Sequence, residues 1–109
     1  MSDTAKLLIN VLLDQTALWA DRHDAALDLS EYNEDQVVAA LLTVACNPNE
    51  EQTIIATCGE SLGLIWIQRK QLDLNSLYRL TDAAKSEALA VINHYQPTWI
   101  SDNHIPFSD

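Results

Sequence analysis

Residues 49–68 read NEEQTIIATCGESLGLIWIQ, and this stretch decides the fold. Its large apolar side chains recur at steps of three and four residues, as on one side of an α-helix: Ile54, Ile55, Cys58, Leu62, Ile65 and Trp66. Asn49 and Gln52 form a helix-start signal, so we expect a helix from there to about Gln68. Gly59 and Gly63 lie four residues apart on it. Because an interior glycine costs about 1 kcal/mol relative to alanine, this pair predicts close approach of a neighbouring helix.

The same start signal occurs upstream as Asn33-Glu-Asp-Gln36 and is followed at once by an apolar run at helical spacing. Asn47-Pro48 ends that run, because the residue before a proline is disfavoured in the α region. We therefore expect a helix over residues 34–46, with Asn33 as its capping residue. Apolar residues further upstream predict a first helix over residues 4–20. Residues 23–29 are expected to add at most one helical turn to a connection.

Two more helices are expected downstream, a short amphipathic one over residues 73–80 and a longer one over residues 81–95. After Pro97 the periodicity is lost, so residues 98–109 are expected to form an irregular tail. Trp99, Ile100, Ile105 and Phe107 make this tail too apolar to be free, and we expect it to pack on the helices.

The pattern as a whole is typical of an all-α protein. No alternating strand pattern appears, and the chain has only two glycines and three prolines. The connections are short, as antiparallel helix pairs require. We expect residues 1–109 to form a single domain of five or six short antiparallel helices, stacked as α-hairpins in a HEAT-like manner.

The charge is unevenly distributed along the chain. Sixteen acids against six bases give a net charge of −10, yet no Lys or Arg occurs from His23 to Gln68. That segment contains eight acids: Asp24, Asp28, Glu31, Glu34, Asp35, Glu50, Glu51 and Glu60. It predicts an acidic surface on the N-terminal half, which attracts basic partners and repels the phosphates of nucleic acids.

The sequence contains no signal for a membrane or an oxidising compartment. Charged residues interrupt every apolar run before the roughly 18 residues that a membrane span needs. The N-terminus lacks the pattern of a signal peptide, so we expect a cytoplasmic protein. Cys46 and Cys58 are therefore expected to be reduced thiols that behave as small hydrophobes.

No pattern of catalytic or metal-binding residues appears. His23, His94 and His104 are isolated in sequence, without the spacing that metal ligands require. The string Cys58-Gly-Glu-Ser61 lies inside a predicted helix, which does not expose a nucleophile on a strained turn. No glycine-rich phosphate loop or calcium loop is present. We expect no enzyme activity, no metal and no cofactor.

The predicted partner-binding residues are six from the acidic segment and one from the tail: Asp24, Asp28, Glu31, Tyr32, Glu34, Asp35 and Trp99. The acids would attract a basic protein, and the aromatic residues would anchor it once water is expelled. Tyr32 lies in a predicted loop flanked by acids, whereas Trp19 and Trp66 lie on apolar stripes and are expected in the core. A plain solvated face that keeps the protein soluble is the alternative interpretation.

From Asn47 to about Ile92 the chain resembles small helical immunity proteins of contact-dependent growth inhibition systems. The resemblance rests on Cys58-Gly-Glu-Ser-Leu-Gly-Leu-Ile-Trp66, followed by Leu72-Asp-Leu and Leu77-Tyr-Arg-Leu. It implies an immunity protein that neutralises a cognate toxin domain, a basic RNase or DNase, by blocking its active site. The alternative is a helix-repeat adaptor for protein–protein interactions without an inhibitory role.

Overall fold

The computed structural model describes residues 2–107, and its regular elements are all helical. They are α1 (Asp3–Leu13), α2 (Trp19–Asp28), the 3-10 helix η1 (Leu29–Glu31), α3 (Asp35–Ala45), α4 (Gln52–Arg69), α5 (Leu74–Arg79), α6 (Asp82–Tyr95) and α7 (Pro97–Asp102). No strand occurs in this range, so the all-α prediction is confirmed. The described residues form seven α-helices rather than five or six.

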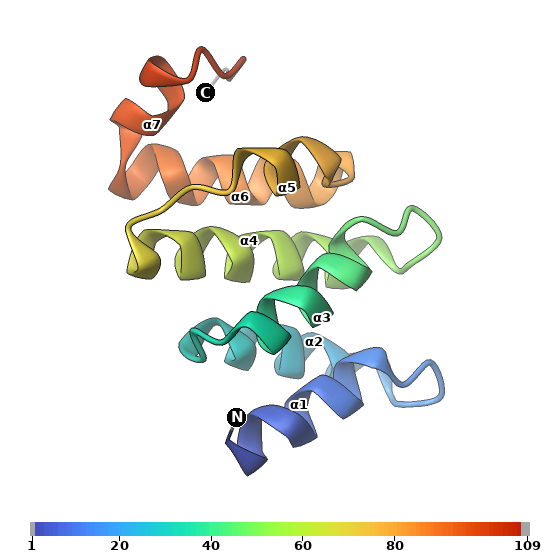
Figure 1. The fold of residues 1–109 in the computed structure, drawn as a ribbon. Helices are drawn as coiled ribbons and strands as arrows, with labels where there is room; N and C mark the ends of the chain where they lie inside the picture. The colour runs from blue at the N-terminus through green and yellow to red at the C-terminus, as the bar shows by residue number, and fades with distance from the viewer. Residues whose placement is uncertain (1, 108–109) are drawn as a thin grey trace.

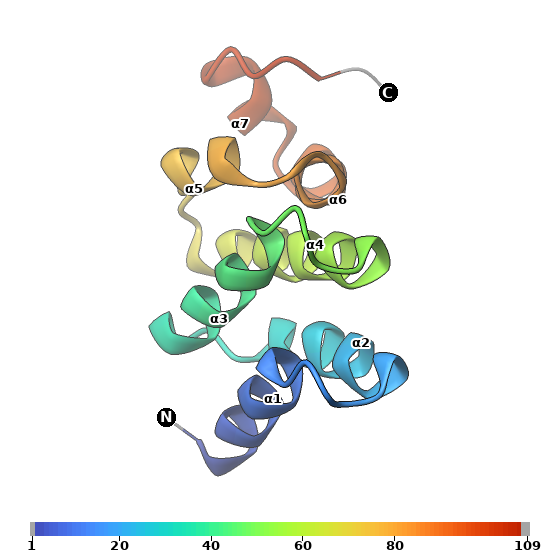
Figure 2. The same ribbon diagram turned by 90° about the vertical axis from the view of Figure 1, so that its right-hand side faces the viewer.

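The helices stack along the 40 Å long axis of the molecule, with the two ends of the chain at opposite ends of the stack (Figure 1). Seen from the side, α2, α4 and α6 form one layer, and α1, α3 and α5 form the other (Figure 2). The most extensive helix–helix contact joins α4 to α6, and α4 also packs on α2 and α3. The helix over residues 49–68 is thus the centre of the fold.

The two glycines of α4 allow this close contact. A Cβ atom built on Gly59 would lie 2.1 Å from the carbonyl oxygen of Ala84 on α6, far inside van der Waals distance. A Cβ atom on Gly63 would lie 3.1 Å from Cβ of Val91, which is tight but close to normal contact. The prediction that both glycines serve helix packing is confirmed.

The core lies between the two layers and is formed by apolar residues from α1 through α6 and from the C-terminal segment. Trp66 is 1% exposed and is its largest side chain, as expected for the apolar stripe of α4. Cys58 is fully buried and Cys46 half-buried, and both are free thiols. Within residues 2–107 no helix is long and apolar enough to span a bilayer.

The predicted first helix over residues 4–20 is wrong, because the chain forms two helices there. α1 ends at Leu13, and α2 begins at Trp19. The Asp14 carboxylate accepts hydrogen bonds from the Thr16 backbone N–H at 2.9 Å and from the Thr16 hydroxyl at 2.6 Å. This local turn competes with helix continuation. Residues 23–28, which were expected to add at most one helical turn, therefore belong to α2.

Helices α3 and α4 begin near the expected positions but with different capping residues. α3 begins at Asp35, and the side-chain oxygen Oδ1 of Asn33 accepts a hydrogen bond from Nε of Arg69 instead of capping the helix. α4 is capped by Glu51, whose carboxylate accepts from the backbone N–H of Ile54 at 3.0 Å, and not by Asn49. The expected ends of both helices agree with the structure within one residue, as do those of α5 and α6.

The C-terminal segment is partly helical, which corrects the prediction of an irregular tail over residues 98–109. Pro97 begins α7, since proline at a first helical position has no N–H to lose. The predicted packing on the core is confirmed: Ile105 is buried, and Trp99, Ile100 and Phe107 are partly buried against the core. The last two positions of that prediction, 108 and 109, lie outside the described residues.

Candidate functional site

The candidate site is an acidic stripe on the outer side of α2 and η1, which we define as Asp21, Asp24, Asp28 and Glu31. Their spacing of three, four and three residues places them along one side of the helix, and all four are exposed. Within residues 2–107 no Lys or Arg pairs with any of them. Asp24, Asp28 and Glu31 were predicted; Asp21 was missed, because it lies just before the base-free segment.

The other predicted acids are in a different situation. Asp35 begins α3 and forms an ion pair with Arg69 at 3.0 Å, so its charge is partly neutralised. Glu34 is half-buried, and its Oε2 atom is enclosed without a hydrogen-bond partner among the described residues. These two residues follow the acidic stripe in sequence but offer less free negative charge than it does.

The two aromatic residues predicted as anchors are less accessible than expected. Tyr32 is half-buried and packs against the core. Trp99 lies on α7, at the opposite end of the stack from α2 (Figure 1). The structure therefore does not bring Trp99 together with the predicted acids. Its partial burial gives it a packing role at the C-terminal end.

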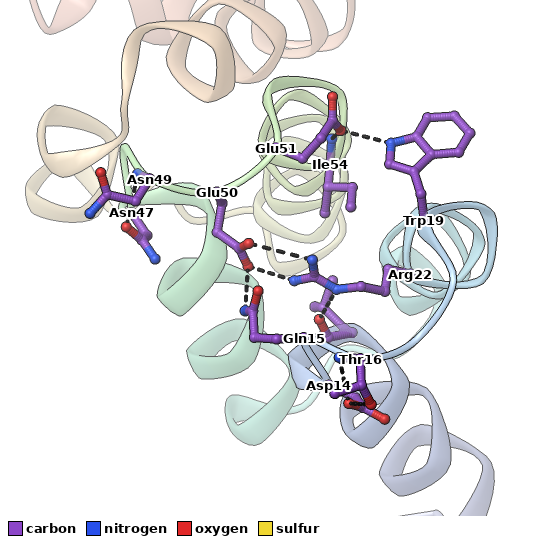
Figure 3. Close-up of polar contacts among 11 residues, drawn as sticks. Asp14, Gln15, Thr16, Trp19, Arg22, Asn47, Asn49, Glu50, Glu51 and Ile54 are labelled. Carbon is purple, nitrogen blue, oxygen red and sulfur yellow. Dashed lines mark hydrogen bonds and ion pairs between the residues drawn. The ribbon is translucent and has the colours of Figure 1, made fainter.

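Trp19 is an exposed aromatic residue at the start of α2, on the side that faces α4 rather than on the acidic stripe, although the sequence placed it in the core. Its side chain is 51% exposed. The indole N–H donates a hydrogen bond to Glu51 at 2.8 Å, and the ring stacks on His23 with 5.4 Å between centroids (Figure 3). The core prediction failed because α2 is a separate helix that buries Arg22, Ala25 and Ala26 instead.

His23 and Glu51 hold the Trp19 ring from two sides. Nε2 of His23 lies 2.9 Å from the hydroxyl of Thr57 on α4, which fixes the imidazole beneath the indole. The hydrogen bond from Trp19 is the largest cause that lowers the pKa of Glu51 below its ordinary value of 4.5. An aromatic side chain fixed before binding loses little conformational entropy when a partner covers it.

A buried ion pair behind this surface joins α2 to the loop before α4. Arg22 donates to Glu50 at 2.5 Å and to the carbonyl oxygen of Leu12 at 2.9 Å (Figure 3). Both charged side chains are 7% exposed, and Gln15 adds a hydrogen bond to Glu50 at 3.1 Å. Glu50 was counted with the acidic surface, but it is a structural residue that positions α2.

The Arg22–Glu50 pair predicts loss of stability in acid. The hydrogen bond from Arg22 lowers the pKa of Glu50 below its ordinary 4.5, so folding is favoured by its ionised form. This contribution is complete above about pH 4.5 and is lost as the pH falls through the lowered pKa. We expect the free energy of unfolding, measured in urea, to fall less steeply between about pH 4.5 and pH 3 in Glu50→Gln than in the wild type. Equal slopes in the two proteins would contradict this assignment.

The thiols of Cys46 and Cys58 and the hydroxyl of Ser61 are engaged in packing. Burial raises the pKa of the Cys58 thiol to about 12, and burial also raises that of Cys46. The Ser61 hydroxyl is buried and donates to the carbonyl oxygen of Ala26 at 2.7 Å. Among residues 2–107 no three His, Cys, Asp or Glu side chains are grouped as metal ligands.

α2 therefore presents a row of exposed carboxylates on one side and a fixed aromatic ring on the side toward α4. Exposed carboxylates are complementary to a cation-rich surface. No known protein family matches the chain, and neither does any curated protein or solved structure.

Proposed function

We propose that this protein is an immunity protein that binds a basic toxin domain, a nuclease, and blocks its active site with the acidic stripe. The observation that carries the proposal is the row of exposed carboxylates Asp21, Asp24, Asp28 and Glu31, which have no Lys or Arg partner among residues 2–107. Asp24 alone has a neighbour of possible positive charge, Nδ1 of His23 at 3.8 Å. A nuclease needs a basic cleft to hold phosphates, and carboxylates can occupy that cleft in their place.

The placement of the bases supports the proposal. Arg22 is buried against Glu50, and Arg69 pairs with Asp35 at the end of α4. Lys85 lies 5.9 Å from the ring centroid of Tyr78, on the side of α6 that faces α5. None of these cations offsets the acidic stripe, so its field reaches an approaching basic protein and raises the association rate.

The mode of action we propose is stoichiometric binding by a HEAT-like stack of α-hairpins, without catalysis and without a cofactor. The protein would act in the cytoplasm and contact neither nucleic acid nor membrane directly. The buried state of Cys58 and Ser61 supports a non-catalytic role, because neither of these two nucleophiles reaches the surface.

Charge reversal on α2 tests the proposal. We expect Asp24→Lys with Asp28→Lys to slow association with the toxin domain encoded beside this gene by about 10-fold at low salt, because steering is lost. The matched control reverses Asp3 and Asp102, which are exposed on the first and last helices. Stopped-flow measurements at two salt concentrations give the rates. Equal rates for the two double variants, or a neighbouring gene without a toxin domain, would contradict the proposal.

A helix-repeat adaptor is the second candidate, and a groove between α1 and α3 favours it. The groove has a volume of about 480 Å³ and is lined mostly by apolar surface, including Ile9, Leu13 and Ala40. An adaptor that bound through it would show affinity that changes little with salt and falls when Leu13 becomes Asp. Strong salt dependence with no effect of Leu13→Asp would favour the inhibitor.

A further inference from the structure

A groove separates α4 from α6 on the outer side of their layer, on a surface that the acidic stripe does not include. It has a volume of about 380 Å³. α4 lines it with Glu60 and Leu64, and α6 lines it with Glu87, Val91 and His94. The glycine contacts bring the two helices so close that the groove is shallow at its base.

The two helices run parallel, because Gly59 meets Ala84 and Gly63 meets Ala88 and Val91. On each helix a glutamate is followed four residues later, about one turn on, by an apolar residue. Glu60 and Glu87 therefore stand on opposite walls at one level, with Leu64 and Val91 at the next. The groove thus presents two carboxylates at one level and two apolar side chains, one on each wall, at the next.

Among the described residues, no positively charged side chain pairs with these two carboxylates. Glu60 and Glu87 form no ion pair within residues 2–107. Lys85 lies on the same helix as Glu87 but is placed over Tyr78, in a different pocket. Two like charges held on facing walls are relieved when a cation enters between them, so the groove is complementary to a positive charge.

We infer that this groove accepts an arginine side chain of a basic protein partner. The aliphatic stem lies along Leu64 and Val91, and the guanidinium donates to Glu60 and Glu87. The assignment of the partner as a toxin rests on the proposed function. It adds to that function a second contact on the same layer, which would fix the orientation of the bound toxin.

The groove adjoins the surface around Trp19. Thr57, which contacts His23 at 2.9 Å, lies three residues before Glu60 on α4. α2, α4 and α6 form one layer (Figure 2), so the groove and the acidic stripe belong to neighbouring helices of the same layer.

A short peptide tests the groove without the toxin. We expect acetyl-Gly-Arg-Gly-amide, titrated into the ¹⁵N-labelled full chain, to shift the backbone amide signals of Glu60, Leu64, Glu87 and Val91. The same peptide with citrulline in place of arginine keeps the shape and removes the charge. Glu60→Gln with Glu87→Gln should weaken binding about 5-fold, since exposed ion pairs each contribute less than about 1 kcal/mol. The control, Asp3→Asn with Asp102→Asn, removes the same charge elsewhere and should bind as the wild type does.

The outcomes separate this inference from the proposed function. Equal shifts with the arginine and citrulline peptides, or equal binding by the Glu60/Glu87 double variant and its control, would overturn the groove assignment. The acidic stripe would then still be tested by the reversals at Asp24 and Asp28. Arginine-specific shifts in the groove, together with no binding of the toxin domain, would support the groove and overturn the immunity role.

Discussion

Gly59→Ala is expected to lower the free energy of unfolding by about 3 kcal/mol, because the new methyl group has no space. Its Cβ would lie 2.1 Å from the backbone oxygen of Ala84 and 2.5 Å from its Cα. Backbone atoms cannot rotate away as a side chain can, so α6 has to move as a body away from α4. That movement weakens the largest helix–helix contact of the fold. Urea denaturation should measure the loss, and the melting temperature should fall by roughly 12 °C or more.

Gly63→Ala is the matched control on the same helix. Its Cβ would lie 3.1 Å from Cβ of Val91 and 3.2 Å from the carbonyl oxygen of Ala88, so α6 has to give way by only a few tenths of an ångström. Alanine also favours the helix by about 1 kcal/mol relative to glycine, which offsets the crowding. We expect a change of less than about 1 kcal/mol. Equal losses of unfolding free energy in Gly59→Ala and Gly63→Ala would show that the Ala84 backbone does not set how closely α4 and α6 approach.

Arg22→Met should destabilise the protein by about 3 to 5 kcal/mol, because it leaves the Glu50 carboxylate buried without its cation. Arg22 is 6% exposed and also donates to the carbonyl oxygen of Leu12, so the variant removes two contacts at once. These contacts join the end of α1 and the loop before α4 to α2. Hydrogen exchange should therefore show the largest loss of protection in α1 and α2.

The double variant Arg22→Met with Glu50→Leu separates charge from packing. It removes both members of the pair, so no unpaired charge stays buried, and we expect it to be more stable than Arg22→Met alone. A free energy of unfolding for Arg22→Met within about 1 kcal/mol of the wild-type value would contradict the structural role of the pair. The Asp24 and Asp28 reversals keep Arg22 and Glu50 intact, so their effect on binding is independent of this clamp.

Helices whose apolar residues form one unbroken stripe were predictable from the sequence. This holds for α3, α4 and α6, since the three- and four-residue steps report which side faces the core. The break after Leu13 was not predictable from spacing, because Leu12, Leu18 and Trp19 continue a helical pattern across it. The turn held by the hydrogen bonds from Thr16 to Asp14 ends α1 there.

The acidic character of the candidate surface was also readable from the sequence, but the state of each acid was not. Glu50 reaches Arg22 across 28 residues, and Glu51 reaches Trp19 across 32. Because of these two contacts, Glu50 and Glu51 are structural residues rather than free surface acids. The contact with Glu51 holds Trp19 at the surface. Glu87 lies outside the base-free segment, so no sequence pattern associates it with Glu60.

By itself, the sequence determined an all-helical chain with a base-free acidic segment, because apolar spacing and charge are local properties of neighbouring residues. The tertiary structure alone decided which acids remain free at the surface and which aromatic ring stays exposed. Hydrogen bonds and ion pairs join residues from different helices, and their partners are fixed only when those helices pack. The close approach of α4 and α6 at Gly59 is the contact that places Glu60 opposite Glu87.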